Sequence, residues 1–327
     1  MDFNLILNQS ITQGLGVQAV IFALAAIGLN VHFGYTGLLN FGQAAFLAVA
    51  AYGLGVTVAT LGLSLWVGIL VGLLAAVVLA LLLGIPTLRL RADYLAIVTI
   101  ASAEIVRLVV RSVTLRDIFG GSDGINRFAN DFYALNPFSA GLALGPLTFS
   151  QNDLFVVVVG WLLVALSCLI VFLAMRSPWG RVLKGIREDE DAVRSLGKNV
   201  YSYKMQSLVL GGVLGCLGGF IFAISSQSVQ PDNYGTDLTF FAWAALILGG
   251  AARVFGPVLG SILFWFLLVF INVALTEAVR VGYITFIDGT QVGQIQFWIL
   301  GLSLMLLMIF RPQGILGDKR ELAFDVK

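Results

Sequence analysis

Charged residues are scarce in this sequence, and their scarcity is uneven along the chain. Of its 327 residues, 11% are Asp, Glu, Lys or Arg and 59% are hydrophobic, whereas globular proteins carry about 25% charged residues. None of the four charged types occurs between Asp2 and Arg89. Because a membrane-spanning helix needs about 20 apolar residues, this stretch alone holds about three crossings. These features exclude a soluble protein with one core and predict an all-α polytopic membrane protein.

Side chains suited to metal or redox chemistry are also few. The sequence has one histidine, His32, and two cysteines, Cys168 and Cys216, which both lie within apolar runs. Cysteines in such runs usually pack as small hydrophobes, and these ligands are too few for a zinc or haem site. We therefore predict no metal, cofactor or catalytic residue in this chain, and we expect His32 to be a packed or interfacial ring.

The basic residues argue against a nucleic-acid partner, because the 19 Lys and Arg are spread through the loops and are nearly balanced by 18 Asp and Glu, for a formal net charge of +1. The N-terminus has no basic region ahead of its first apolar run. We therefore expect the first helix to be retained rather than removed as a signal peptide.

Uncharged windows divide the chain into about nine predicted crossings, within a range of eight to ten. They lie near residues 11–32, 41–61, 63–86, 94–112, 154–175, 205–224, 238–254, 256–276 and 292–310. Nine spans of about 20 residues each leave too little chain for a second folded domain. Residues 1–327 are therefore predicted to form a single transmembrane domain.

The positive-inside rule orients these crossings. Of the 19 basic residues, 14 fall on one side, in the loop at Arg89, the loop 176–204, the turn at Arg253 and the tail after residue 310. That side is predicted to be cytoplasmic, which places the C-terminus inside and the N-terminus outside. The outer loop 113–153 is then either a solvated connection or a docking surface for an external partner.

Glycines four residues apart predict close helix contacts. One stripe contains Gly211, Gly215 and Gly219, and shorter pairs occur at Gly68 with Gly72 and at Gly256 with Gly260. In lipid such stripes let helix backbones approach and pack, but they carry no information about a substrate.

The loop 176–204 is the only long charged stretch of the chain. Acidic residues from Glu188 to Asp191 precede an apolar pair, and Arg194 and Gly197 follow. Acids at the start, a base near the end and a glycine just after are typical of a short helix. With a second short helix over 181–187, the loop is predicted to be a cytoplasmic helical hairpin; a solvated positive loop is the alternative.

The stretch GRVLKGIREDEDAVRSLGKNVYSYK in this loop resembles the coupling loop of ABC-importer permeases of the branched-chain amino acid class, of the LivM-like type. Asp191, Ala192, Val193 and Gly197 occupy the places of that family's Glu-Ala-Ala and Gly. Further blocks in the family's order are GLNVHFGYTGLLNFGQAAFLAVAAYG, LRLRADYLAIVTIASAEIVR, FGGSDGI, ALILGGAARVFGPVLGSILF and IFRPQGILG. The resemblance thus extends over nearly the whole chain.

This resemblance implies a permease of the bacterial inner membrane that works within a larger complex. The implied partners are a second, H-type permease in a heterodimer, two cytoplasmic ATPases that hold ATP and Mg²⁺, and an external substrate-binding protein. The residues implied in coupling to the ATPases are Arg187, Glu188, Glu190, Asp191, Ala192, Val193 and Gly197. The implied substrates are branched-chain amino acids, with urea or short amides as alternatives.

The sequence agrees that ATP is split elsewhere. A phosphate-binding P-loop needs Gly-x4-Gly-Lys followed by Ser or Thr, and the nearest match, at residues 197–199, lacks the upstream glycine and the hydroxyl. We predict a transport subunit without enzymatic activity. A secondary transporter remains the rival class, although such carriers usually hold more intramembrane acids.

Two places are candidates for the translocation path. Glu104 lies midway along the fourth window, on one helical face with Arg107 and Arg111. Ionisable residues at that depth are costly and usually functional, and a zwitterionic substrate would need both charge signs. The alternative is a structural Glu104–Arg107 pair at the subunit interface, with Arg111 reaching to the outer surface.

Interrupted helices are the second indication of a transport site. The segment 34–43 ends an apolar run with three glycines and supplies the candidates Asn40, Gly42 and Gln43. Free backbone amides there would suit a carboxylate. The segment 231–237 is similar, but an ordinary polar connection at the membrane edge is the favoured interpretation for it.

Overall fold

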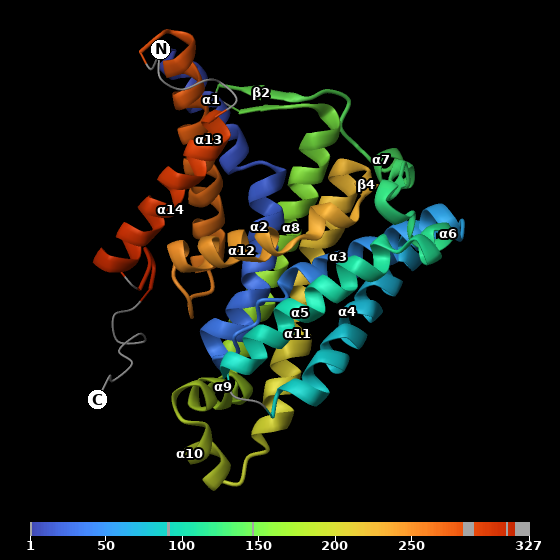
Figure 1. Cartoon of the computed structure of the whole chain (residues 1–327), viewed down its shortest axis with the longest axis vertical. Coiled ribbons are helices and arrows are strands. Elements are labelled where there is room, and N and C mark those ends of the chain that lie inside the picture. Colours follow the sequence, from blue (N-terminus) through green and yellow to red (C-terminus); the bar gives the residue numbers. More distant parts are fainter. Residues whose placement is uncertain (1, 90–91, 146, 284–290, 312, 318–327) are drawn as a thin grey trace.

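The computed structural model describes residues 2–89, 92–145, 147–283, 291–311 and 313–317, and within them the chain is almost entirely helical (Figure 1). Part of the predicted cytoplasmic charge, at Arg91, Lys319, Arg320 and Lys327, lies outside these residues. The long helices are α2 (Val17–Leu29), α3 (Gln43–Gly55), α4 (Leu65–Thr87), α5 (Ala92–Arg111), α8 (Gln151–Arg176), α11 (Val200–Ser226), α12 (Thr236–Gly249), α13 (Gly256–Arg280) and α14 (Val292–Phe310).

Each of the nine predicted windows falls on one of these helices, and seven of the described helices are long and apolar enough to cross a membrane. These seven include α2 and α3 together with the π-helical turns that extend them, η1 (Asn30–Tyr35) and η2 (Val56–Thr60). Of the other two, α12 has only 14 residues, about 21 Å at 1.5 Å per residue, against a hydrocarbon core of about 30 Å. The other, α5, has 20 residues but carries several charges.

The first window is wrong at its start, because the chain breaks its helix at Leu15 and Gly16. Residues before the break form a separate helix, α1 (Phe3–Gly14), capped by the Asp2 carboxylate. This helix packs on α13, where a Cβ on Gly14 would lie 3.1 Å from Phe266 Cβ. The first crossing therefore begins at Val17.

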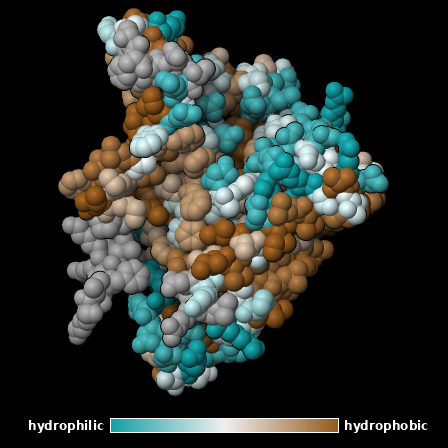
Figure 2. Space-filling view, viewed as in Figure 1, coloured by the Kyte–Doolittle hydropathy of each residue, from teal (hydrophilic) through white to brown (hydrophobic). Residues whose placement is uncertain are grey.

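Helices α2, α3 and α11 form the centre of the bundle. In the span Val17–Tyr35, 83% of the most apolar 18-residue stretch is buried, compared with 17% of the corresponding stretch in α13 and in α14. The α2 sequence is apolar on all sides, as a helix surrounded by others must be. The outer helices expose apolar side chains, which form a brown belt between two teal ends (Figure 2).

The predicted glycine stripes do make the closest helix contacts. A Cβ on Gly28 of α2 would lie 2.4 Å from the Gly211 carbonyl oxygen, and one on Gly219 would lie 2.2 Å from the Leu47 carbonyl oxygen. A Cβ on Gly72 would similarly reach 2.5 Å from the Phe220 ring. No larger residue fits such approaches, so glycine here sets the distance between the central helices.

The interruption predicted at residues 34–43 is confirmed. The π-helical turn η1 closes α2 at Tyr35, residues 37–42 are not helical, and α3 begins at Gln43. The second predicted interruption holds the short 3-10 turn η5 (Pro231–Tyr234) between α11 and α12.

The outer loop is structured rather than extended. It contains the short turns η3 (Val113–Leu115), α6 (Arg116–Phe119), η4 (Gly121–Asp123) and α7 (Asn130–Ala134), and the strands β1 (Ile125–Asn126), β2 (Leu142–Leu144) and β3 (Leu147–Phe149). Strands β2 and β3 pair with each other, and β1 pairs antiparallel with β4 (Ser228–Val229), which follows α11. The loop is thereby attached to the end of α11.

The charged loop forms the predicted hairpin at the opposite end of the molecule from α6 and α7 (Figure 1). Its two helices are α9 (Pro178–Glu188) and α10 (Glu190–Ser195). Only Ser177 separates α8 from α9, and residues 196–199 connect α10 to α11. The hairpin is therefore joined to two long helices by short connections.

Candidate functional site

Local hydrogen bonds define both ends of α10. The Asp189 carboxylate accepts bonds from the backbone N–H groups of Asp191 and Ala192, each 2.9 Å long, so Asp189 is the N-cap. At the other end Gly197 N–H donates to the Arg194 carbonyl and Lys198 N–H to the Val193 carbonyl, with Gly197 at φ +76°. This is a Schellman motif, in which glycine is favoured because φ is positive.

The predicted coupling residues divide into an exposed and an internal group. Glu188, Asp191, Ala192 and Gly197 are exposed, whereas Val193 is buried. Glu188 is the last residue of α9 rather than the first acid of α10. Val193 therefore packs the two hairpin helices together, and the exposed group is the part that a partner protein can reach.

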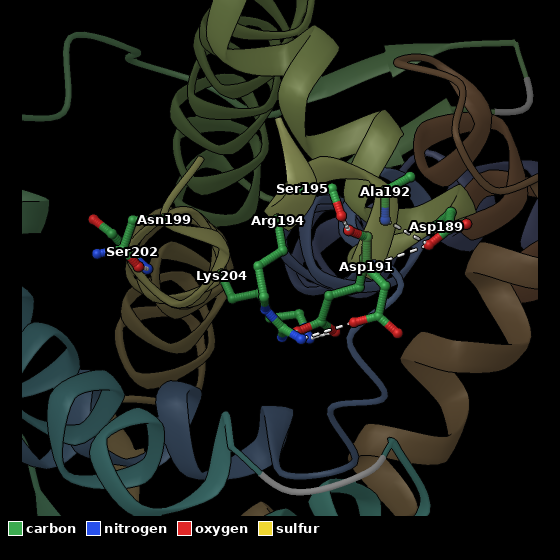
Figure 3. A network of polar contacts seen from close by, with 9 residues as sticks. Asp189, Asp191, Ala192, Arg194, Ser195, Asn199, Ser202 and Lys204 are labelled. Atoms are coloured by element: carbon green, nitrogen blue, oxygen red, sulfur yellow. Dashed lines mark hydrogen bonds and ion pairs between the residues drawn. The ribbon is translucent and has the colours of Figure 1, made fainter. Parts of the chain in front are cut away.

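An ion-pair network ties α10 to α11. Arg194 contacts the Asp191 and Glu190 carboxylates at 2.7 and 2.8 Å, and Lys204 of α11 pairs with the other oxygen of Glu190. In Figure 3 the side chains of Arg194 and Lys204 converge beside Asp191. Glu190, one of the residues that the resemblance implies in coupling to the ATPases, binds within the chain and fixes the hairpin to α11.

Arg187 connects the hairpin to the interrupted helix. Its guanidinium donates a hydrogen bond to the Gly34 carbonyl oxygen in the π-helical turn. Its side chain also covers Gly37, where a Cβ would lie 3.3 Å from Arg187 Cγ. The hairpin and the interruption, two segments that the sequence marks separately, are therefore in direct contact.

The path candidates in the interruption are fully buried in a polar cluster. Asn40 Nδ2 lies 3.1 Å from His32 Nδ1 and 3.2 Å from Gln43 Oε1, and the Asn40 carbonyl accepts a 3.0 Å bond from Trp243 Nε1. His32 Nε2 in turn lies 3.0 Å from the Leu208 carbonyl. His32 is thus packed, as expected, but it also joins α11 to the interruption.

Two details show how tightly this cluster is enclosed. A Cβ on Gly42 would lie 2.5 Å from the Thr99 carbonyl of α5, and one on Gly215 would lie 1.7 Å from Gln43 Nε2. Among the described residues, Gln43 Nε2 has no hydrogen-bond partner. In this conformation the cluster positions α2, α3, α5 and α11 relative to one another and is closed to a solute.

The second path candidate forms a half-exposed cluster of four charges. Glu104 and Arg107 make a two-bonded pair at 2.5 and 3.0 Å, and Arg107 also contacts Asp232 of η5 at 2.8 Å. Arg111 contacts the same Asp232 oxygen at 3.1 Å. In the alternative with a structural Glu104–Arg107 pair, Arg111 was instead expected to reach the outer surface. Two acids and two bases from α5 and η5 therefore balance each other.

The two path candidates touch α5 at different places. Phe41 N–H donates to the Thr99 hydroxyl, one and a half helical turns before Glu104. The interruption therefore bonds α5 through Thr99 rather than through the charged residues.

Comparisons with known proteins identify the architecture. The family described as the permease component of the branched-chain amino acid transport system matches residues 11–310. This chain belongs to that family. It is 31% identical to the Escherichia coli K12 high-affinity branched-chain amino acid permease protein LivM over 320 residues, covering 94% of this chain and 71% of the relative.

More distant relatives extend the family to other organisms. A probable LivM permease of Methanocaldococcus jannaschii is 24% identical over 337 residues, and the alignment covers 91% of this chain and 91% of that protein. The nucleoside ABC transporter permease NupC of Lactococcus lactis is 27% identical over 236 residues, or 70% of this chain and 71% of that protein. The chain is accordingly a multi-pass permease subunit of an ABC importer, and a secondary transporter is not favoured.

Two residues of this permease site escaped the sequence analysis. Leu196 at the end of α10 exposes 79% of its surface. Its place as an apolar residue in a charged loop could have indicated a docking role from the sequence. Asp232 was placed in a polar connection, and no local signal pairs it with Arg107, which lies 125 positions away.

Metal-binding geometry is absent from the part of the chain that the structure describes, since it holds no group of three or more His, Cys, Asp or Glu side chains able to share an ion. Cys168 and Cys216 are both buried and unbridged, as predicted for small packed side chains.

Proposed function

We propose that this permease imports branched-chain amino acids by transmitting ATPase motion from the hairpin α9–α10 to the interrupted helix. The contact of Arg187 with the Gly34 carbonyl carries this proposal, because it joins the segment resembling the family's coupling loop to the break in the first crossing. The ion pair between Glu190 and Lys204 supplies a second connection, to α11. A hairpin held by a partner would move both elements as a rigid body.

The docking face for the ATPase is the exposed side of α10. Asp191, Ala192, Leu196 and Gly197 are accessible, and Leu196 supplies an apolar anchor among polar neighbours. Buried apolar side chains contribute most of the energy of such contacts, surrounded by a polar rim. Arg187, Glu190 and Val193 act behind this face by holding the hairpin in place, and exposed Glu188 lies at its edge.

The proposed complex contains this permease, an H-type permease, two ATPases that bind ATP and Mg²⁺, and an external binding protein. This chain supplies no ATPase site of its own. We place the complex in a bacterial inner membrane with the hairpin in the cytoplasm, in keeping with the basic residues on α8 and α9. Leu316 lines the same hollow as Arg176 and Lys184, which supports a cytoplasmic C-terminus as well.

For the translocation path we propose the charge cluster rather than the buried cluster. Glu104 and Asp232 can pair with an ammonium group, and Arg107 with a carboxylate, which are the two charges of an amino acid. Their side chains are 19–62% exposed, so a solute can reach them. Asn40, Gly42 and Gln43 have the different role of transmitting motion to α5 and α11.

A substitution at Gly197 tests the coupling proposal in the reconstituted complete transporter. Proline cannot adopt φ +76° and has no N–H for the Schellman motif, so Gly197→Pro should redirect α10. We expect leucine uptake by proteoliposomes to fall while ATP hydrolysis continues. The matched control is Gly62→Pro, which alters a glycine at φ +65° with open space around it and far from the hairpin. Equal uptake by Gly197→Pro and the unsubstituted protein would contradict the proposal.

A further inference from the structure

A polar pocket of about 760 Å³ lies where α4 meets the hairpin and α11. Its walls come from the end of α4, from α10 and from the start of α11. The lining residues are Leu88, Arg89, Glu190, Asp191, Arg194, Lys198, Asn199, Val200, Tyr201 and Lys204. The size suits a small-molecule group.

The lining carries an excess of two positive charges, since it has four basic and two acidic side chains. The acids are already neutralised within the chain, because Arg194 and Lys204 hold both carboxylates. Among the described residues, Arg89 and Lys198 have no carboxylate partner. Arg89 instead lies over the Tyr201 ring, 5.6 Å from its centroid. The pocket therefore offers two cations for an anion.

The pocket lies where the apolar span α4 ends. The apolar span α4 ends at Thr87, immediately before the lining residues Leu88 and Arg89. On the last two turns of α4, Leu82 and Ile85 expose 66% and 59% of their surfaces. The Tyr201 hydroxyl reaches back to the Ile85 carbonyl at 3.4 Å. Tyrosine and basic residues at this level are typical of the interface with lipid headgroups.

We propose that this pocket binds the headgroup of an anionic phospholipid. The phosphate lies between Arg89 and Lys198, and the acyl chains run along the exposed face of α4 beside Leu82 and Ile85. A basic pocket that continues into an apolar helix face fits a molecule with a charged head and a hydrocarbon tail. A soluble phosphate would use only the first half of this surface. Since α10 forms one wall, the bound headgroup also braces the hairpin.

Native mass spectrometry of the full chain in detergent tests this site, with dioleoylphosphatidylglycerol and dioleoylphosphatidylcholine as probes. We expect the anionic lipid to bind at least about tenfold more tightly, since each basic residue near a headgroup contributes appreciably. The double variant Arg89→Gln/Lys198→Gln should lose this preference. The control Arg181→Gln/Arg127→Gln removes two exposed cations outside the pocket and should keep it. Thermal midpoints check that both variants remain folded.

Several outcomes would overturn the assignment. One is equal binding of the two lipids, and another is an equal loss of binding in the control variant. Displacement of the lipid by an equal concentration of glycerol phosphate would identify a site for a soluble anion. If the pocket variant lost ATPase association but kept lipid binding, the pocket would belong to the protein interface. None of these results depends on whether the hairpin couples transport.

Discussion

Arg187 and Gly34 are 153 positions apart in the chain, yet the guanidinium of one donates a hydrogen bond to the backbone carbonyl of the other. A carbonyl at the end of a π-helical turn has lost its regular helical partner, so a charged donor from another element can hold it. The hairpin thereby holds the end of the first crossing in place.

Replacing Arg187 should separate ATP hydrolysis from transport. A hydrogen bond from a charged group contributes about 1.5–3 kcal/mol, which corresponds to about tenfold or more in an equilibrium. We expect Arg187→Ala to lower leucine uptake by proteoliposomes at least about tenfold while the ATPase rate stays close to that of the unsubstituted protein. Arg181→Ala, which removes an exposed cation from the same helix, should leave both rates unchanged. Parallel loss of both rates would point to failed assembly instead.

Gly28→Ala should destabilise the centre of the bundle. The added methyl would meet the Gly211 carbonyl at 2.4 Å and Gly215 Cα at 2.8 Å, both backbone atoms, and overpacking of this kind costs about 1–3 kcal/mol. The midpoint of thermal unfolding, followed by tryptophan fluorescence in detergent, should fall. Gly301→Ala on α14, which has nothing within 4 Å, should be neutral or stabilising. Equal midpoints for Gly28→Ala and the unsubstituted protein would contradict this account of the packing at Gly28.

Neutralising Glu104 and Arg107 together distinguishes a path from a structural pair. Glu104→Gln/Arg107→Gln removes both charges, with an isosteric change at Glu104 and a shorter polar side chain at Arg107. Loss of a part-exposed pair changes stability by less than about 1 kcal/mol. If the charges bind the substrate, the KM for leucine uptake should rise while assembly is normal. The exposed pair in the outer loop, removed in Arg116→Gln/Asp123→Asn, provides the comparison. An unaltered KM would leave the Glu104–Arg107 pair with a structural role only.

Leu196→Asp should weaken the association with the ATPase. Burial of a leucine side chain contributes about 1.5–3 kcal/mol, so the apparent affinity should fall about 10- to 100-fold. Pull-down of the separately purified ATPase by the permease in detergent measures this. Val113→Asp, at an apolar residue that is 84% exposed at the other end of the molecule, should bind normally. Equal retention of the ATPase by both variants would move the docking face away from Leu196.

The sequence predicts the hairpin well because its signals are local. Capping acids and Gly197 lie within a few residues of the helix that they define, and the Schellman bonds follow from that spacing. The glycine stripes are equally informative, since a missing Cβ is a property of each position. The start of the first crossing is less predictable, because Leu15 and Gly16 break the helix in the middle of an apolar run.

Interactions between distant segments account for what the sequence could not provide. The pairing of Asp232 with Arg107 depends on how η5 packs against α5, and no periodicity encodes it. Burial decides the role of Gln43 in the same way, because only the fold shows that Gly28 and Gly215 surround its amide. The sequence also does not show that Glu190 pairs with Lys204, because the two residues meet only when α10 packs against α11.

Helix α11 runs without a break for 27 residues, about 40 Å, and is held at both ends. The hairpin is attached at one end through Lys204, and the outer loop is attached at the other through the pairing of β4 with β1. Effects between two such sites are reciprocal: each must change the affinity at the other by the same factor. If the outer loop receives the substrate and the hairpin holds an ATPase, as proposed, binding at either end would change the affinity at the other, because one unbroken helix connects them.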